Sequence, residues 1–329
     1  MNRAALRPID PKAYEPHALH RVNRAWVESN CYVDLWIEIL HALGCEPVAS
    51  LPYVLTIDWE GDQFTFFKPP HRDLDSLYGL DVQELNVYRP LVETAAAQLE
   101  GGKLVLAEAD SFFLPDTAGT DYRRNHVKTT IGIQELDIEA RRLGYFHNAG
   151  YHALEGDDFA QLFRLGAPDD PTFMPFFAEF VRTGRAVRLE DSSLVARSKK
   201  LLGHHLARLP SRNPIEAFAA RLEADVEGLV RAGLPTYHLY AFATVRQLGA
   251  ACELATTYLA WLDEHGEPGL ERSAAAFAAI SELSKAVILK LGRTVGNRKP
   301  ADVSSLLSEA ARRWREGTEC LASRYGAGR

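Results

Sequence analysis

Apolar and polar positions follow two different patterns along the chain and divide it into two parts. Up to residue 187, short apolar runs alternate with glycine, proline and polar turns, which is typical of strands and short helices. From residue 188 on, long segments carry apolar residues at helical spacing. The pattern therefore predicts an α+β domain over residues 1–187 and an all-α helical bundle domain over residues 188–329.

Individual elements follow from the same patterns. In the first part we expect helices over 31–43, 91–99 and 159–165, a hairpin of strands 53–59 and 63–68, a strand over 103–107 and a β region over 127–151. In the second part we expect helices over 189–209, 214–232, 237–264, 270–291 and 303–325. The first 30 residues are polar and contain several prolines, so we expect an extended arm there.

The segment 31–43 is apolar around most of its circumference, which indicates a helix buried inside a domain. Serine and asparagine precede it as cap formers, and Gly44 ends it. Its few polar residues continue the side of the helix on which Cys31 lies. They are Asp34, Glu38 and His41. Two metal-ligand types on one helix do not make a site of three or four ligands, so we expect no metal there.

Composition narrows the class of protein. The chain has 329 residues, 47% of them hydrophobic, which is enough for two cores. Its net charge of −7 disfavours a general nucleic-acid binder. The four cysteines lie far apart and form no C-x-x-C pair, which suits free thiols in a reducing cytoplasm. We see no apolar signal segment and no membrane span, so we expect a cytoplasmic protein.

Cys31 is the candidate nucleophile. A thiol in the first turn of a helix feels the positive end of the helix dipole, which favours the reactive thiolate. A free cysteine is also commonly a small buried apolar residue, and that alternative stays open.

A base and an orienting group for Cys31 come from the region 126–148. If the chain turns at Asp137, the two strands of a hairpin bring His126 opposite Asn148. A cysteine, a histidine and an asparagine in this order form the catalytic set of papain-like enzymes. Asp110, at the end of the preceding strand, is the rival orienting group. Each of these residues also has an ordinary role in a turn or a cap.

Three features of the sequence together carry a resemblance to a known family. Asn30-Cys31-Tyr32 opens the buried helix, Asp110-Ser-Phe-Phe-Leu-Pro115 follows, and His126 precedes a β run. This combination resembles the butirosin-biosynthesis-type acyltransferases, and most of all a related bacterial family found near aminoacyl carrier proteins. The resemblance covers residues 21–165 and extends more loosely to the helical part.

The resemblance implies a papain-like fold and transfer of an aminoacyl group from a phosphopantetheine thioester to an amine. Cys31 would carry the acyl group and His126 would act as base. The chain departs from relatives in having Asn148 where aspartate is common, which leaves the role of Asp110 open. The oxyanion would be stabilised by the Cys31 amide and by a donor from Asn30, Asn23 or Ser29.

Polar residues in the helix predicted over 237–264 are candidates for binding the substrate. Arg246, Gln247 and Glu253 interrupt an otherwise apolar face, and buried polar groups need partners. They would recognise the ammonium or carboxylate of an amino acid, or they form ion pairs between helices. Asn30 completes the predicted substrate-binding set.

Three basic clusters stand out in the acidic chain and would suit an acidic carrier protein. They are Arg182/Arg185/Arg188, Arg197/Lys199/Lys200 and Arg293/Arg298/Lys299. The leading interpretation is therefore a cysteine-dependent acyltransferase without a bound cofactor, acting on the phosphopantetheine arm of a carrier protein. The alternatives are a thioesterase or amidase with the same residues, and a catalytically silent module that binds carrier proteins.

Overall fold

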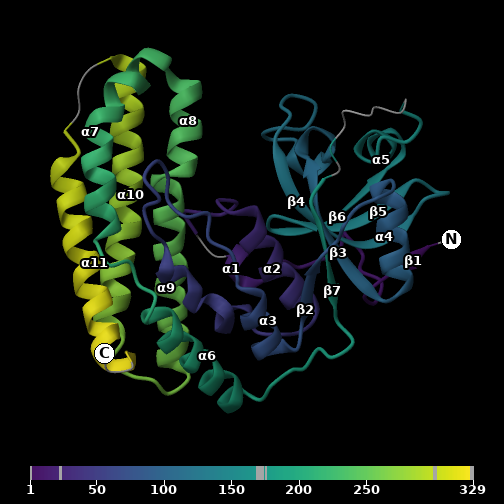
Figure 1. Cartoon of the computed structure of the whole chain (residues 1–329), viewed down its shortest axis with the longest axis horizontal. Helices are drawn as coiled ribbons and strands as arrows, with labels where there is room; N and C mark the ends of the chain where they lie inside the picture. The colour runs from purple at the N-terminus through teal and green to yellow at the C-terminus, as the bar shows by residue number, and fades with distance from the viewer. Residues whose placement is uncertain (1, 22–23, 168–173, 175, 299–301, 327–329) are drawn as a thin grey trace. The chain divides into compact units, whose positions relative to one another are not determined.

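The computed structural model describes residues 2–21, 24–167, 174, 176–298 and 302–326. The fold is α+β, with an antiparallel sheet and helices followed by a helical region (Figure 1). The chain folds into two compact units. The sheet unit consists of Met1–Val22, Cys31–Cys45 and His71–Arg188. The helical unit consists of Asn23–Asn30, Glu46–Pro70 and Leu189–Arg329.

Seven strands form the sheet in the described part of the chain. They are β1 (Arg3–Ala4), β2 (Asp81–Glu84), β3 (Lys103–Asp110), β4 (Lys128–Asp137), β5 (Arg142–His147), β6 (Gly150–Glu155) and β7 (Ala178–Arg182). Their order is β2-β7-β3-β4-β5-β6, with β1 paired to β4, and each pair is antiparallel. The β region expected over 127–151 thus becomes β4, β5 and the start of β6.

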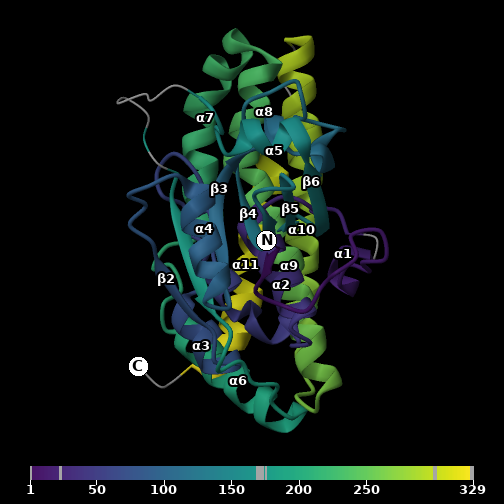
Figure 2. The ribbon, with the colours of Figure 1, turned by 90° about the vertical axis from the view of Figure 1, so that its right-hand side faces the viewer.

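Helices of the sheet unit cover both faces of this sheet. They are α1 (Ala18–Arg21), α2 (Cys31–Ala42), α3 (His71–Tyr78), α4 (Leu91–Glu100) and α5 (Gly156–Leu162), with short 3-10 helices η2 (Ser111–Phe113) and η3 (Pro115–Thr117). Figure 2 shows α4 lying beside β3, and its apolar residues join those of β3 and β4 in one core. On the other face, α2 packs against β4 and β5. The helices expected over 31–43 and 91–99 are therefore confirmed.

The hairpin expected from strands 53–59 and 63–68 is wrong, because neither segment is a strand. Residues Pro47–Thr56 form a ten-residue 3-10 helix, η1, and only Trp59 and Phe64 form an isolated antiparallel bridge. Nine residues of η1 are buried, so an apolar run that resembles a buried strand belongs to a helix buried on all sides. Periodicity alone does not separate these two cases.

Long helices make up most of the helical unit. They are α6 (Asp191–Leu206), α7 (Pro214–Ala232), α8 (Leu234–Ala243), α9 (Val245–Glu264), α10 (Glu271–Asn297) and α11 (Ser304–Tyr325). The segment expected as one helix over 237–264 is two helices, because the chain breaks at Thr244 with φ −116° and ψ −102°. Helix α10 contacts α9 and α11 along much of its length (Figure 1). The 3-10 helix η1 packs on α6 and α9.

The division into units differs from a single cut between residues 187 and 188. The chain enters the helical unit for good at Leu189, but Asn23–Asn30 and Glu46–Pro70 also group with the helices. The chain thus passes from one unit to the other several times, once at the peptide bond between Asn30 and Cys31.

Candidate active site

Helix α2 presents Cys31 at its first position. The thiol is half-buried, and the amides of a helix's first turn have no partner within the helix. Nδ2 of Asn30, the residue before the helix, donates to the carbonyl of Phe67 at 2.8 Å. Cys31 thus lies at the end of α2 that carries the positive partial charge of the helix dipole, as the sequence predicts.

A glycine in the sheet lets α2 approach closely. A β-carbon at Gly132 of β4 would lie 2.9 Å from Cδ1 of Leu35 and 3.3 Å from Cδ1 of Ile39. A contact of 2.9 Å is too short for a real β-carbon, so any larger residue at this position would push α2 away from the sheet. Because Gly132 pairs with Leu106 of β3, Leu106 points to the same face.

His126 and Asp110 form a close pair at the end of β3. Nδ1 of His126 lies 2.6 Å from Oδ2 of Asp110, and the imidazole stacks on Phe112 with ring centroids 4.3 Å apart. The other oxygen of Asp110 accepts from the amide of Phe112 at 3.0 Å and so caps η2. The aspartate is thus held in place, while the imidazole stays 67% exposed.

Asp110 belongs to the face of the sheet that α2 covers. Side chains of a strand alternate between faces, so Leu106 and Asp110 point the same way. Tyr32, next to Cys31, donates to Glu179 of β7 at 2.7 Å, and Glu179 is the register partner of Leu106. The hydroxyl of Tyr32 therefore reaches β7 on the sheet face to which Leu106 and Asp110 belong.

The predicted pairing of His126 with Asn148 is wrong. Strands β4 and β5 pair Gly132 with Phe146 and Leu136 with Leu143, and a bulge interrupts the register between them. His126 precedes β4, whereas Asn148 lies in the turn after β5 with a left-handed φ of 46°. The chain turns after Asp137 rather than at it, which shifts the register by about four residues. Asn148 is a turn former, and Asp110 contacts the histidine instead.

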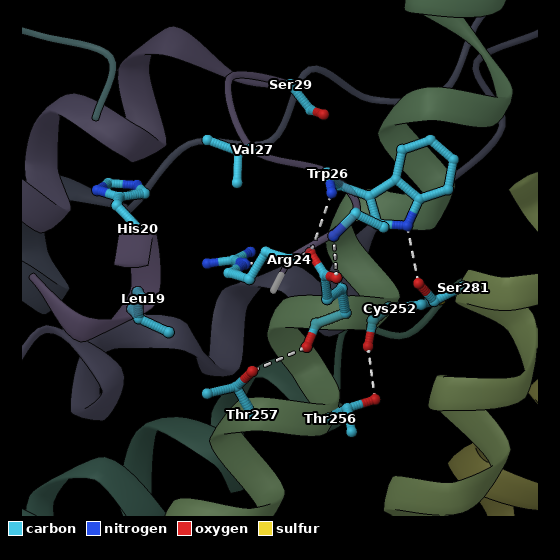
Figure 3. Close-up of polar contacts among 12 residues, drawn as sticks. Leu19, His20, Arg24, Trp26, Val27, Ser29, Cys252, Thr256, Thr257 and Ser281 are labelled. Atoms are coloured by element: carbon cyan, nitrogen blue, oxygen red, sulfur yellow. Dashed lines mark hydrogen bonds and ion pairs between the residues drawn. The ribbon is translucent and has the colours of Figure 1, made fainter. Parts of the chain in front are cut away.

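The predicted substrate-binding residues of α9 hold the segment that precedes Cys31. Both oxygens of Glu253 accept hydrogen bonds: Oε1 accepts from the amide of Ala25 at 2.8 Å, and Oε2 accepts from Nε of Arg24 at 3.1 Å. Nε1 of Trp26 donates to Ser281 at 2.7 Å (Figure 3). These contacts lie within the helical unit and are those of a structural anchor.

Arg246 and Gln247 bind the next residues of the same segment. Nε of Arg246 donates to Oγ of Ser29 at 3.0 Å, and Nη2 donates to the carbonyl of Val27 at 3.2 Å. Nε2 of Gln247 donates to the carbonyl of Ser29 at 2.8 Å. In the described residues these polar groups thus bind the segment before Cys31, whereas the alternative to substrate binding was ion pairs between helices. Asn23 lies outside the described residues.

Two family descriptions match the chain, one in each part. The DUF1839 N-terminal domain matches residues 15–183, and the DUF1839 C-terminal domain matches residues 191–323. The chain belongs to the DUF1839 family. No curated protein matches it. The DUF1839 N-terminal domain contains Cys31, Asp110 and His126, whereas Arg246, Gln247 and Glu253 lie in the C-terminal domain.

The DUF1839 N-terminal domain contains a second histidine–carboxylate pair that sequence reasoning missed. Nδ1 of His147 lies 2.5 Å from Oδ2 of Asp116, and Nε2 lies 2.8 Å from Oγ1 of Thr129. Tyr145 donates to the other oxygen of Asp116. Burial alone raises the pKa of Asp116, but hydrogen bonding to His147 and the histidine's charge outweigh it and hold the pKa below its ordinary value.

This second pair lies on the face opposite α2. Tyr145 belongs to the core that α4 and α5 share with the sheet. His147 lies two residues after Tyr145 on β5, and Thr129 lies two residues before Ile131 on β4, so both side chains point to that same face. The network therefore fixes η3 against β4 and β5 instead of facing Cys31. In the sequence, His147 stands directly before Asn148, the residue expected to orient His126. Only the register of β4 with β5 shows that His147 and not Asn148 points to Asp116.

Parts of the basic clusters are already paired. Arg182 forms an ion pair with Asp81, and Lys199 forms an ion pair with Glu267. Nε of Arg188 donates a hydrogen bond to the carbonyl of Leu43 at 2.8 Å. Lys299 lies outside the described residues. Across the described ranges, no helix is long and apolar enough to cross a membrane, and no three histidine, cysteine or acidic side chains are arranged to hold a metal ion.

Proposed function

We propose that this DUF1839 protein is a cysteine-dependent acyltransferase of papain-like fold, which moves an aminoacyl group from a carrier protein to an amine. One observation carries the proposal. The Asp110–His126 pair stands at the end of β3, on the sheet face covered by the helix that begins at Cys31. A nucleophile at a helix start and an oriented imidazole on one face of a sheet are the parts that thiol catalysis requires.

Each residue has one role in the proposed reaction. Asp110 fixes the ring of His126 through Nδ1, so Nε2 is the nitrogen that exchanges protons with the Cys31 thiol. The Cys31 amide at the helix start would stabilise the oxyanion of a tetrahedral intermediate. Asn148 has no part in this set, because it closes the turn between β5 and β6.

The reaction proceeds in two halves. The Cys31 thiolate attacks the carbonyl carbon of the carrier's thioester, a carbon–sulfur bond forms, and the pantetheine thiol leaves with a proton from His126. The amine acceptor then attacks the acyl-Cys31 carbonyl and loses its proton to His126, and the Cys31 thiolate leaves. Atoms and charge balance without an oxidant or a bound cofactor.

Several features support this proposal over a silent binding module. An exposed imidazole held at 2.6 Å by a carboxylate is more ordered than an ordinary surface histidine. The resemblance to butirosin-type acyltransferases involves Cys31, Asp110 and His126, which are the residues that share this sheet face. The dispersed free thiols agree with a reducing cytoplasm as the place of action.

Mass spectrometry with a loaded carrier protein tests the proposal. Wild-type protein is incubated with glycyl carrier protein, and Cys31→Ser and His126→Ala variants serve as comparisons. We expect a glycyl adduct on Cys31 that disappears in Cys31→Ser and forms at least ~100-fold more slowly in His126→Ala. Added amine acceptors should consume the adduct faster than water does, which separates a transferase from a hydrolase.

Thiol labelling supplies the independent control. Cys320 in α11 is half-buried like Cys31 and serves as the internal reference thiol. We expect iodoacetamide to modify Cys31 faster than Cys320 at neutral pH, and the His126→Ala change to remove the difference. Equal labelling of the two cysteines, unchanged in His126→Ala, together with no adduct, would contradict the proposal.

A further inference from the structure

The polar side of α2 carries a buried charge cluster that the proposed reaction does not use. Asp34 and Glu38 lie one turn apart on α2, and the chain segment before α2 covers them with Tyr14, His17 and His20. The side chains of His20 and Glu38 are fully buried, and that of Asp34 is 7% exposed. All five residues belong to the sheet unit.

Both carboxylate oxygens of Glu38 have hydrogen-bond partners. Oε2 accepts from the hydroxyl of Tyr14 at 2.5 Å, Oε1 accepts from the amide of His17 at 3.1 Å, and Nδ1 of His20 contacts Oε1. Burial disfavours the charged carboxylate, but the hydrogen bonds from His20 and Tyr14 prevail and lower the pKa of Glu38. Glu38 and a protonated His20 therefore neutralise each other.

Asp34 differs, because half of its carboxylate has no partner. Oδ1 lies 3.2 Å from Nε2 of His20, whereas no donor of the described residues reaches the buried Oδ2. One imidazolium faces two carboxylates, so the cluster keeps about one negative charge out of contact with water. A buried charge without a full set of partners is costly, and a cation would relieve it.

The unpartnered carboxylate lies one turn from the proposed nucleophile. Cys31 and Asp34 are three residues apart on α2, which places their β-carbons roughly 5–6 Å from each other on one side of the helix. In an α-aminoacyl group bound to Cys31, the ammonium nitrogen is three bonds from the sulfur. A group of that length is on the scale of the general spacing between β-carbons one helical turn apart.

We propose that Asp34 recognises the α-ammonium group of the acyl group on Cys31 and restricts the enzyme to α-aminoacyl thioesters. The inference rests on the proposed function and assigns the residue that selects its aminoacyl substrates. His20 is a positioning residue in this scheme, because its ring holds Oδ1 of Asp34 and is itself held by Glu38. Acyl groups that lack the ammonium leave the Asp34 charge uncompensated.

Two thioesters of equal shape test this inference. S-glycyl and S-propionyl pantetheine differ only in an ammonium against a methyl group at the end of the acyl chain. We expect wild-type protein to form the glycyl adduct on Cys31 at least ~10-fold faster than the propionyl adduct, because a buried polar group left unpaired is penalised. Mass spectrometry of the full-length chain gives both rates.

Variants locate the preference in Asp34. The Asp34→Asn change removes the charge at nearly constant shape, and we expect the glycyl-to-propionyl rate ratio to fall by ~10-fold or more. Asp34→Glu keeps the charge, and we expect it to keep part of the preference. Circular dichroism and iodoacetamide labelling of Cys31 verify that each variant is folded.

The outcomes separate this inference from the proposed function. Adducts that form equally fast from both thioesters on wild-type protein overturn the role of Asp34 and leave the acyl-Cys31 chemistry standing, with no variant needed. A glycyl preference that persists in folded Asp34→Asn also overturns it. If neither thioester modifies Cys31 and a glycyl carrier protein does not either, the proposed function itself fails and the inference fails with it.

Discussion

At the scale of single residues, the most informative pair is His126 with Asp110. They are 16 residues apart in the sequence, and their side chains lie 2.6 Å apart because β3 ends where the neighbouring strand β4 begins. Asp110 was one of two candidates for this role, and Asn148 was the other. The distance and the register together select Asp110.

A pair of matched variants tests that selection. Asp110→Asn keeps the shape but weakens the hydrogen bond that orients His126, so we expect acyl-Cys31 formation to slow by on the order of tenfold or more. Asn148→Gly preserves the left-handed turn, and we expect a rate within about twofold of wild type. Rates come from mass spectrometry with glycyl carrier protein. A loss confined to the Asn148 variant would reverse the assignment.

The buried histidine on the polar side of α2 predicts how stability depends on pH. Burial by itself lowers the pKa of His20, but hydrogen bonds and charges from Asp34 and Glu38 raise it from 6.5 to about 9. A raised pKa stabilises the fold fully below pH 6.5, and this stabilisation is lost as pH rises through 9. The corresponding loss in unfolding free energy is on the order of 3 kcal/mol.

Urea unfolding of wild type and His20→Gln measures this effect. We expect the difference in unfolding free energy between the two proteins to be largest near pH 6 and to shrink as pH approaches 9.5. The comparison stays above the range in which His17 titrates, since burial and the charge of His41 lower its pKa to about 4. A difference that stays constant from pH 6 to 9.5 would contradict the charged state of His20.

At the scale of elements, α9 holds the segment that leads to Cys31. Glu253, Gln247 and Arg246 bind consecutive parts of the segment 24–29, and Gly249 allows the indole of Trp26 to lie against the helix. A β-carbon at Gly249 would lie 2.4 Å from that ring. The sequence identified these polar residues of α9 as unusual, but only the fold reveals what they bind.

Amide hydrogen exchange distinguishes an anchor from a substrate-binding residue. In Glu253→Gln the acceptor for the amide of Ala25 is weakened and Arg24 loses its ion pair, so we expect faster exchange at Ala25 and a stability loss of about 1–3 kcal/mol. Glu264→Gln, at the exposed end of α9, should change neither. Unchanged exchange at Ala25 together with weaker substrate binding would restore the substrate-binding role.

At the scale of the whole molecule, the two compact units do not follow the order of the chain. The helical unit includes Glu46–Pro70 from the first part of the sequence, and η1 within it packs on α6 and α9. Ser198 of α6 donates to the carbonyl of Ala49 at 2.7 Å, which ties η1 into this core. A cut at residue 188 therefore removes part of the core of the helical unit.

A fragment experiment measures the importance of these inserted segments. We expect the fragment 188–329 to bind a hydrophobic dye and to unfold without a cooperative transition, because the surfaces of α6 and α9 that η1 covers become exposed. Joining residues 46–70 to the fragment should restore part of the cooperativity. A sharp urea transition in the fragment alone would contradict this view of the unit.

The sequence by itself determined the elements with strong periodicity and the residues with chemical character. It placed α2 at Cys31, gave α7 its bounds, and singled out His126 and Asp110, because capping and helical spacing are local properties. Tertiary structure decided the register of β4 with β5, the helical state of η1, and the partners of Arg246, Gln247 and Glu253. These outcomes depend on contacts between residues far apart in the chain, where a shift of a few residues or a second buried face changes each pairing without changing the local pattern.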